Sequence, residues 1–146
     1  MPILKNLMDM LKPGGYLQWS EHNLATITVK SIKPGMKTDE LEYLVDHAKN
    51  AVTYGWPPRL GDSFTTQGFQ EVSQNRYPSS PEIRLFFTQL QFMVGEEYSF
   101  VAMDNSDLSK GGPAHRRRIQ EAAKEAKEGA AMDFIPEVSI GRKPIH

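Results

Sequence analysis

The sequence predicts an α/β fold built on a small sheet, and three observations support this. Apolar residues recur at helical spacing in four stretches, near residues 2–12, 39–54, 80–103 and 114–128. Short strand-like runs stand between or after them, at residues 16–19, 69–77 and 137–142. Clusters of glycine and proline separate the two kinds of element. The predicted order is helix, strand, helix, strand, helix, helix, strand, which is typical of the tail end of an α/β sheet.

The chain opens on a helix over residues 2–12, followed by a tight turn. Lys12-Pro13-Gly14-Gly15 ends the helix, because proline cannot continue it and glycine accepts a left-handed exit. Tyr16-Leu17-Gln18-Trp19 then predicts a short buried strand. The stretch from Ala25 to Ile32 is rich in Thr, Ile and Val and could be a strand or an ordered loop.

The middle of the chain predicts a helix, a helical turn and a strand. The helix runs from about Asp39 to Tyr54, with Thr38 or Asp39 capping its free amides, and Gly55-Trp56-Pro57-Pro58 ends it. A helical turn over Asp62–Gln67 closes at Gly68, and a strand follows from Phe69 to Tyr77.

The last third predicts two helices and a strand. Ser80-Pro81 supplies a cap and a first-turn proline for a helix that extends to about Met103. A charged helix over 114–128 ends at Gly129, and we expect it to be solvated and laced with ion pairs. The final strand is placed at Glu137–Arg142, because the proline before it has no amide to donate to a ladder.

Composition excludes several classes of protein. The 146 residues suit one domain, and the absence of cysteine excludes disulfides and thiolate catalysis. Seventeen basic residues against 18 acidic ones argue against nucleic-acid binding. A mean hydropathy of −0.49 and the lack of a long apolar run or a secretory signal predict no membrane span and a cytoplasmic location. The four histidines have no metal-ligand spacing, so no metal is expected.

Three segments resemble landmarks of the class I S-adenosylmethionine-dependent methyltransferases. Residues 7–21, LMDMLKPGGYLQWSE, resemble the element that leads into the fifth strand, and are most similar to a fungal, secondary-metabolism-like type. Residues 67–72, QGFQEV, resemble the entry to the sixth strand, and residues 140–144, IGRKP, resemble the close of the seventh. The resemblance implies that residues 1–146 form one truncated domain with the fifth to seventh strands. It also implies that residues 79–130 form a helical lid or dimerisation insertion.

The resemblance carries over no cofactor-binding residue. In that family the cofactor lies on the first four strands, beginning with a glycine-rich loop between a strand and a helix. No Gly-x-Gly occurs in that context here, and Gly14-Gly15 precedes a strand, so it presents no helix amides to a ligand. We therefore expect no cofactor on the isolated chain, and S-adenosylmethionine only if the missing half is supplied. Whether Met1 is the genuine start stays open.

Seven residues are candidates for a site. Glu21 and His22 are expected just past the first strand, where open α/β sheets bind ligands. They could orient a substrate hydroxyl and take its proton, or be ordinary loop residues. The candidates for substrate binding are aromatic residues and a methionine that could equally pack in the core: Trp19, Trp56, Phe87, Met93 and Tyr98. The last three lie on an apolar helix that could cover an apolar small molecule or form a dimer face.

Two functions follow, and whether the chain is itself an enzyme stays open. The first is the C-terminal part of a methyltransferase for a small secondary metabolite, which needs a complementing chain or a homodimer and transfers no methyl group alone. The second is a cofactor-independent isomerase or pericyclase on an apolar secondary metabolite, which orients its substrate in a closed pocket.

Overall fold

The computed structural model describes residues 2–51, 55–105 and 111–145, and the fold is mixed α/β, as predicted. The chain divides into two compact units. The first comprises Met1–Ala25, Tyr54–Pro78 and Ile135–His146, and the second comprises Thr26–Thr53 and Ser79–Phe134. The segment 79–130, predicted as a helical insertion, lies in the second unit.

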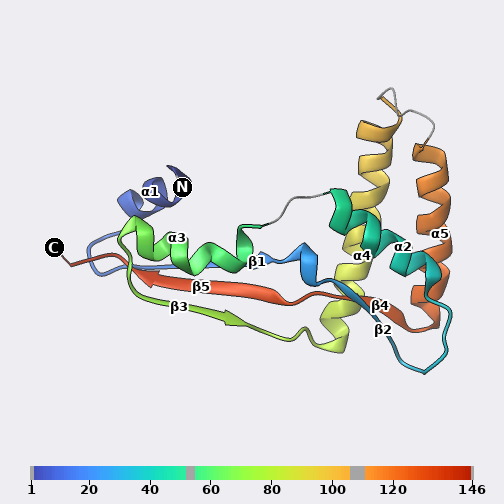
Figure 1. The fold of residues 1–146 in the computed structure, drawn as a ribbon, viewed down its shortest axis with the longest axis horizontal. Helices are drawn as coiled ribbons and strands as arrows, with labels where there is room; N and C mark the ends of the chain where they lie inside the picture. Colours follow the sequence, from blue (N-terminus) through green and yellow to red (C-terminus); the bar gives the residue numbers. More distant parts are fainter. Residues whose placement is uncertain (1, 52–54, 106–110, 146) are drawn as a thin grey trace. The chain divides into compact units, whose positions relative to one another are not determined.

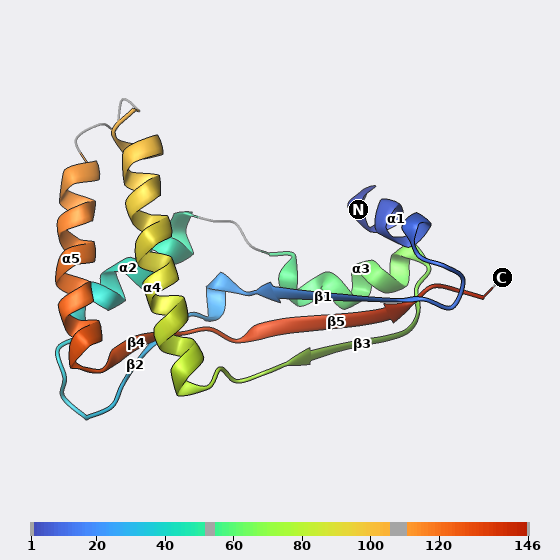
Figure 2. The same ribbon diagram turned by 180° about the vertical axis from the view of Figure 1, so that it is seen from behind.

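The first unit is a three-stranded sheet with two helices on one face (Figures 1 and 2). The sheet order is β1-β5-β3, and β5 runs antiparallel to both neighbours. The last strand therefore lies between the other two, which run parallel to each other and are not paired with one another. The elements are α1 (Pro2–Met10), β1 (Tyr16–His22), a 3₁₀ turn η2 (Pro57–Arg59), α3 (Leu60–Gln67), β3 (Gln70–Arg76) and β5 (Pro136–Arg142).

The prediction of a buried first strand is wrong, because only one face of the sheet is covered. Along β1, Leu17 and Trp19 are half-buried, whereas Tyr16 and Gln18 are exposed. This alternation is typical of an antiparallel sheet with one solvated face. The strand is also longer than predicted and includes Glu21 and His22. Pro136 begins β5, a position where a strand tolerates the missing amide.

The core of the first unit lies between the sheet and its two helices. Leu4 of α1, Leu60 and Phe64 of α3 and Phe69 form its buried centre. Gly141 of β5 faces this cluster, and a Cβ there would lie 2.6 Å from Cδ1 of Phe64 and 3.0 Å from Cβ of Phe69. Phe64 of α3 and Phe69, which directly precedes β3, therefore pack on the backbone of the central strand.

The second unit is a two-stranded sheet packed with three helices. Strands β2 and β4 pair antiparallel, α5 packs against α2 and α4, and α4 also packs against β4. Residues 25–32, which were predicted as either a strand or an ordered loop, form the end of a 3₁₀ turn followed by a strand. The 3₁₀ turn η1 (Leu24–Thr26) spans the boundary between the two units. The elements of the second unit are β2 (Thr28–Ser31), α2 (Asp39–Ala51), α4 (Pro81–Tyr98), a π-helical turn η3 (Ser99–Met103), α5 (Gly112–Glu128) and β4 (Ala130–Asp133).

The structure of this unit differs from the sequence-based prediction in three places. The first-turn amides of α2 are capped across space, because the amides of Glu40 and Leu41 donate to the carboxylate of Glu125 on α5, at 3.2 and 3.0 Å. The long apolar helix leaves α-helical geometry at Tyr98. Strand β4 had no counterpart in the prediction. The Ser80 cap is confirmed, since its hydroxyl accepts from the amide of Ile83. The predicted helix segment at residues 52–54 lies outside the described residues.

We expect Gly141→Ala to lower the free energy of unfolding by about 1–3 kcal/mol, because the new methyl group meets two core rings on a rigid strand. Gly55→Ala is the matched control, since its Cβ would meet nothing closer than 3.6 Å, at Nη2 of Arg59. Urea unfolding of both variants measures the difference. Equal midpoints would contradict the close approach of the rings to β5.

Candidate functional site

A buried carboxylate organises the polar layer under α3. Glu137, on the central strand, is 1% exposed. Its Oε1 accepts from Nδ2 of Asn23 at 3.1 Å and pairs with Nη2 of Arg76 at 3.3 Å, and its Oε2 accepts from Nε2 of Gln74. A buried charge is tolerated only when it is paired and hydrogen-bonded, and these contacts meet that requirement.

Gln74 links this carboxylate to the start of α3. Its Oε1 accepts from the amide of Gly61 at 2.6 Å, and its Nε2 also donates to the carbonyl oxygen of Pro57 at 3.1 Å. The amide side chain therefore uses both ends to fix the η2–α3 corner on the sheet. The local sequence does not predict the contact between Gln74 and Glu137, because the two residues are 63 positions apart.

The structure brings Trp19, Trp56 and Glu21 together beside this layer. The two indole centroids are 5.8 Å apart with an interplanar angle of 68°, and both rings pack on the core of the first unit. Nε1 of Trp19 donates to Oε2 of Glu21 at 3.4 Å. The two rings, here called the aromatic wall, pack on the core of the first unit, and their role in binding a substrate stays a prediction.

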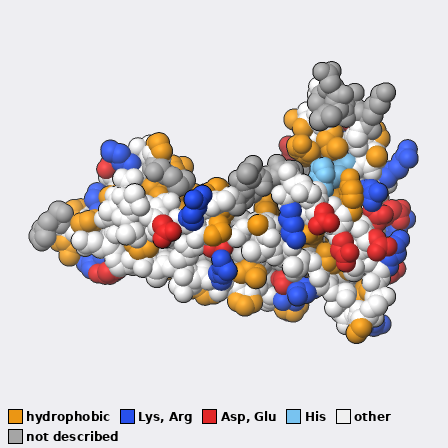
Figure 3. Space-filling model, in the orientation of Figure 1, with side chains coloured by type: hydrophobic (Ala, Val, Ile, Leu, Met, Phe, Trp, Pro, Cys, Tyr) orange, Lys and Arg blue, Asp and Glu red, His pale blue; other side chains and the backbone are white. Residues whose placement is uncertain are grey.

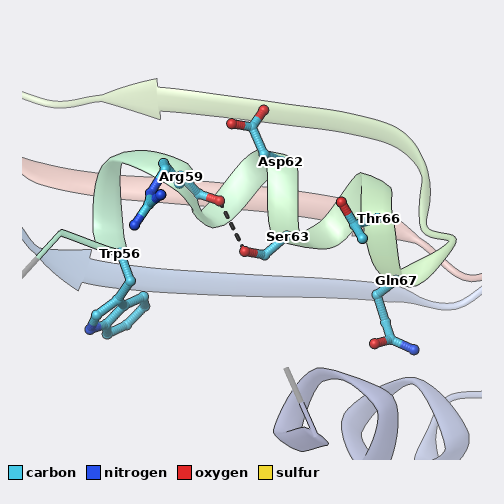
Figure 4. Close-up of a pocket in the computed structure, with 6 residues that line it drawn as sticks. All are labelled: Trp56, Arg59, Asp62, Ser63, Thr66 and Gln67. Atoms are coloured by element: carbon cyan, nitrogen blue, oxygen red, sulfur yellow. Dashed lines mark hydrogen bonds between the residues drawn. The ribbon is translucent and has the colours of Figure 1, made fainter.

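Trp56 also borders a shallow cavity of about 310 Å³ on the outer side of α3 (Figure 4). The side chains that line it are mostly polar, and the hydroxyl of Ser63 donates back to the carbonyl oxygen of Arg59 at 3.1 Å. Besides Trp56, the lining residues are Arg59, Asp62, Ser63, Thr66 and Gln67. Such a surface offers hydrogen bonds from polar side chains and one indole ring, and it is open to solvent.

Glu21 and His22 lie within β1, not after it. As consecutive strand residues they extend toward opposite faces of the sheet. Oε1 of Glu21 accepts from the backbone amide of His22 at 3.2 Å. Burial lowers the pKa of His22, and the charge of Glu21 partly offsets that shift. An imidazole with a lowered pKa is neutral near pH 7 and able to accept a proton. This is compatible with the predicted catalytic role, which stays a prediction.

The other three candidates lie on α4 in the second unit. Phe87 is half-buried, with its ring centroid 5.5 Å from that of Phe134. Met93 and Tyr98 are 68% and 47% exposed. Phe87 thus packs toward the interior of its unit, whereas Met93 and Tyr98 face solvent. Their role in binding a substrate stays a prediction.

Sequence reasoning missed a histidine pair between α2 and α5. The rings of His47 and His115 have centroids 4.7 Å apart, and the ring of Tyr43 lies 6.1 Å from that of His47. His115 is 4% exposed, although its helix was predicted to be solvated. Burial and the neighbouring imidazole hold the pKa of His115 below its ordinary value. The described residues hold no group of three or more His, Asp or Glu side chains that could bind a metal.

The Gly14-Gly15 turn does not offer its amides to a ligand such as S-adenosylmethionine. Gly14 and Gly15 are adjacent glycines at a turn, and both of their amides are already used. The amide of Gly14 donates to the carbonyl oxygen of Lys143 at 3.1 Å, and that of Gly15 donates to Lys12 at 2.9 Å. A pyrophosphate-like or carboxylate ligand would find no free glycine amides in this turn.

None of the described helices is long and apolar enough to cross a bilayer.

Replacing Glu137 with glutamine should destabilise the protein by about 1–3 kcal/mol, because one carboxylate oxygen becomes a donor that faces the amide donor of Asn23 or Gln74. Glu128→Gln, at an exposed position of α5, is the control and should change little. Chemical denaturation near pH 7 measures both. A Glu137→Gln protein as stable as the control would show that the carboxylate does not organise the sheet.

Acidification should destabilise the second unit through His115. The folded-state pKa lies below the unfolded value of about 6.5, so the unfolded chain binds the proton more readily. The stabilisation is therefore complete above pH ~6.5 and is lost as the pH falls through the folded pKa. The charged or titratable groups around the pair are His47 and Tyr43 of α2 and Arg118 of α5, whose guanidinium carbon lies 3.9 Å from the Tyr43 ring centroid.

The test compares unfolding between pH 7.5 and 5 in a His22→Gln background, because His22 also has a lowered pKa. His115→Gln in that background should flatten the pH dependence. An unchanged slope would locate the titration elsewhere.

Comparison with known proteins adds a distant structural likeness. No protein-family model and no curated protein matches the chain. A phosphoethanolamine N-methyltransferase 2 of Haemonchus contortus, solved with phosphomonomethylethanolamine and S-adenosylhomocysteine, aligns with a TM-score of 0.37 and 12% sequence identity. The alignment covers 97% of this chain and 29% of that one, so the chain spans less than a third of the enzyme's length. A likeness this loose assigns neither a family nor an activity.

Proposed function

We propose that the chain is the C-terminal part of an S-adenosylmethionine-dependent methyltransferase for a small secondary metabolite, and that a second chain supplies the cofactor-binding half. The three methyltransferase-like segments fall where that interpretation needs them. LKPGG is the turn between α1 and β1, QGFQEV joins α3 to β3, and IGRKP closes β5. Strands β3 and β5, which correspond to the sixth and seventh strands in this interpretation, pair antiparallel, as the resemblance implies.

The observation that carries the proposal is the unprotected outer edge of β1. Within the described residues this strand pairs with β5 alone. Its seven residues contain no proline, no lysine and no bulge, and their one acidic side chain, Glu21, is half-buried and accepts from Nε1 of Trp19. Proteins usually blunt a free edge by one of these means, because its unpaired amides and carbonyls can take up another strand.

The opposite edge of the sheet is protected, and the contrast supports the proposal. Strand β3 has a bulge between Gln70 and Ser73, where Glu71 adopts a positive φ of 52°. The Glu71 carboxylate is held by the hydroxyl of Tyr16 at 2.9 Å and by Nη1 of Arg142 at 2.7 Å. A bent, charged edge of this kind resists pairing, so a partner strand is expected at β1 and not at β3.

In this proposal the residues at the end of β1 belong to the substrate side of the completed enzyme. Trp19 and Trp56 present the aromatic wall, and Glu21 and His22 supply a carboxylate and a neutral imidazole at the carboxyl end of the strand. The carboxyl ends of strands are where open α/β sheets bind ligands. No residue of this chain is assigned to the cofactor.

The part of the chain that the structure describes offers no specific support for the alternative, a self-sufficient isomerase or pericyclase. That chemistry needs a closed apolar pocket that orients its substrate. The shallow cavity beside Trp56 is bordered by Arg59 of η2 and by polar and acidic side chains of α3 (Figure 4). We therefore advance one function only.

The first test is calorimetric titration of S-adenosylmethionine into the purified, folded chain. The proposal expects no binding in the micromolar range, because it assigns the cofactor to the second chain and the amides of Gly14 and Gly15 are already bonded. Micromolar binding by the chain alone, or turnover of the cofactor by it, would overturn the need for a second chain.

The second test locates the partner with a photo-crosslinking amino acid in extracts of the cells that make the protein. Benzoylphenylalanine at Gln18, on β1, should capture a chain that contains a strand, a Gly-x-Gly loop and a helix. The matched control places it at Asn75, an exposed position on β3. Equal capture at both positions, or capture at Gln18 of a chain without that loop, would contradict the proposal.

A further inference from the structure

Helix α4 is apolar on two opposite sides. One side faces the interior of the second unit and contains the buried Thr88 and Phe92. The opposite side carries five exposed apolar side chains, which we call the outer stripe. Their exposed fractions are 47% for Ile83, 65% for Phe86, 37% for Leu90, 68% for Met93 and 51% for Val94. A surface helix normally has one apolar face, so the second face indicates a partner.

The outer stripe is free of charge along its length. No charged residue occurs from Leu85 to Gly95, and the acidic residues lie at the two ends of the helix. Arg84, the basic residue of α4, is held by Asp133 of β4 at 2.8 Å. In Figure 3, hydrophobic atoms gather over the upper part of α4. An apolar centre with charge only at its rim is the usual composition of a protein interface.

The spacing of the stripe favours a helix as its occupant. Ile83, Phe86, Leu90 and Met93 recur at intervals of three and four residues, which are the a and d positions of a heptad. Such a seam receives the side chains of another helix as knobs in holes. A globular surface or an extended strand would not require that spacing.

A second copy of the chain provides the matching helix. Among the other described helices, α2 and α5 bury their apolar sides, with Tyr43 of α2 under Arg118. Helix α1 exposes only Ile3 and Met10 as large apolar side chains. We propose that two copies of the chain associate through the outer stripe of α4, in a two-fold interface that uses the same surface on both partners.

The available area is sufficient for a small dimer interface. The five side chains of the outer stripe are 37% to 68% exposed. They offer on the order of 500 Å² of surface, against the ~800 Å² that one partner contributes to an interface of standard size.

The two α4 helices run antiparallel in this interface. Glu97 follows Met93 at heptad spacing and is exposed at the end of the stripe. In a parallel pair this carboxylate would face its own copy, and like charges at such positions oppose association. In an antiparallel pair Ile83 of one copy lies near Met93 of the other, and the helix dipoles are also opposed favourably.

The proposal is independent of the methyltransferase assignment, since it concerns the second unit and a partner identical to the chain. Its first test is the molar mass in solution, measured by light scattering and by sedimentation at concentrations on the order of 100 µM. The expected mass is twice the 16.5 kDa of one chain. A monomer at that concentration would overturn the proposal.

Variants on one helix identify the surface. Met93→Lys should raise the dissociation constant about tenfold or more, because it places a charge in the centre of the seam. Leu85→Lys is the matched control, since Leu85 is 49% exposed on the same helix but lies off the stripe. Both positions are exposed, so folding checked by circular dichroism should not change. Equal dissociation constants would place the dimer elsewhere, including the free edge of β1.

Cysteine pairs test the orientation, because the chain has no native cysteine. Mixing Ile83→Cys with Met93→Cys protein under mild oxidation should give a crosslinked heterodimer faster than either variant crosslinks with itself. Faster self-crosslinking would contradict the antiparallel arrangement. Flotation of the wild-type chain, but not of Met93→Lys, with zwitterionic phospholipid vesicles would instead assign the stripe to a lipid surface and overturn the proposal.

Discussion

The buried carboxylate of Glu137 is the constraint on which the first unit depends. The unit is assembled from three segments that are far apart in the sequence, and Glu137 contacts the other two through Asn23, Gln74 and Arg76. A charge in an apolar interior is strongly unfavourable unless all of its oxygens are satisfied. Arrangements that separate these segments leave the carboxylate unpaired, so the polar layer favours one packing of strands and helix over its competitors.

In the second unit, too, buried polar side chains join elements that are far apart in the sequence. The Glu125 carboxylate on α5 caps the first amides of α2, and the hydroxyl of Thr88 on α4 accepts from the amide of Met132 on β4 at 2.8 Å. The first contact joins α5 to α2, and the second joins α4 to β4. Because Thr88 lies on the inner side of α4, its contact orients the helix with the outer stripe toward solvent.

The two units thus expose two different kinds of binding surface. The free edge of β1 offers backbone amides and carbonyls, and its natural occupant is another strand. The outer stripe of α4 offers apolar side chains at heptad spacing, and its natural occupant is another helix. Since the two surfaces differ in the structure that they would bind, the two proposals are compatible: a complementing chain at β1 and a second copy at α4 would not compete. The aromatic wall of Trp19 and Trp56 belongs to the unit with the free strand edge.

The sequence by itself determined the elements that local rules govern. Gly68 and Gly129 end α3 and α5 in the left-handed conformation that glycine accepts, Ser80 caps α4, and helical spacing located α1 and α2. It also identified Trp19, Trp56, Glu21 and His22 as residues worth attention. These signals lie within a few neighbouring residues, which is why they can be recognised without a structure.

Only the tertiary structure decided which distant groups meet. The placement of β5 between β1 and β3, the cap that Glu125 gives to α2, and the contacts of Glu137 all join residues more than 60 positions apart. The pairing of His47 with His115 is of the same kind, since each lies on a different helix. Glu137 and His115 look like ordinary surface residues in the sequence, because a charged or polar side chain shows its partner only after folding. The same holds for the outer stripe: periodicity shows that α4 is apolar, but packing decides which of its faces remains uncovered.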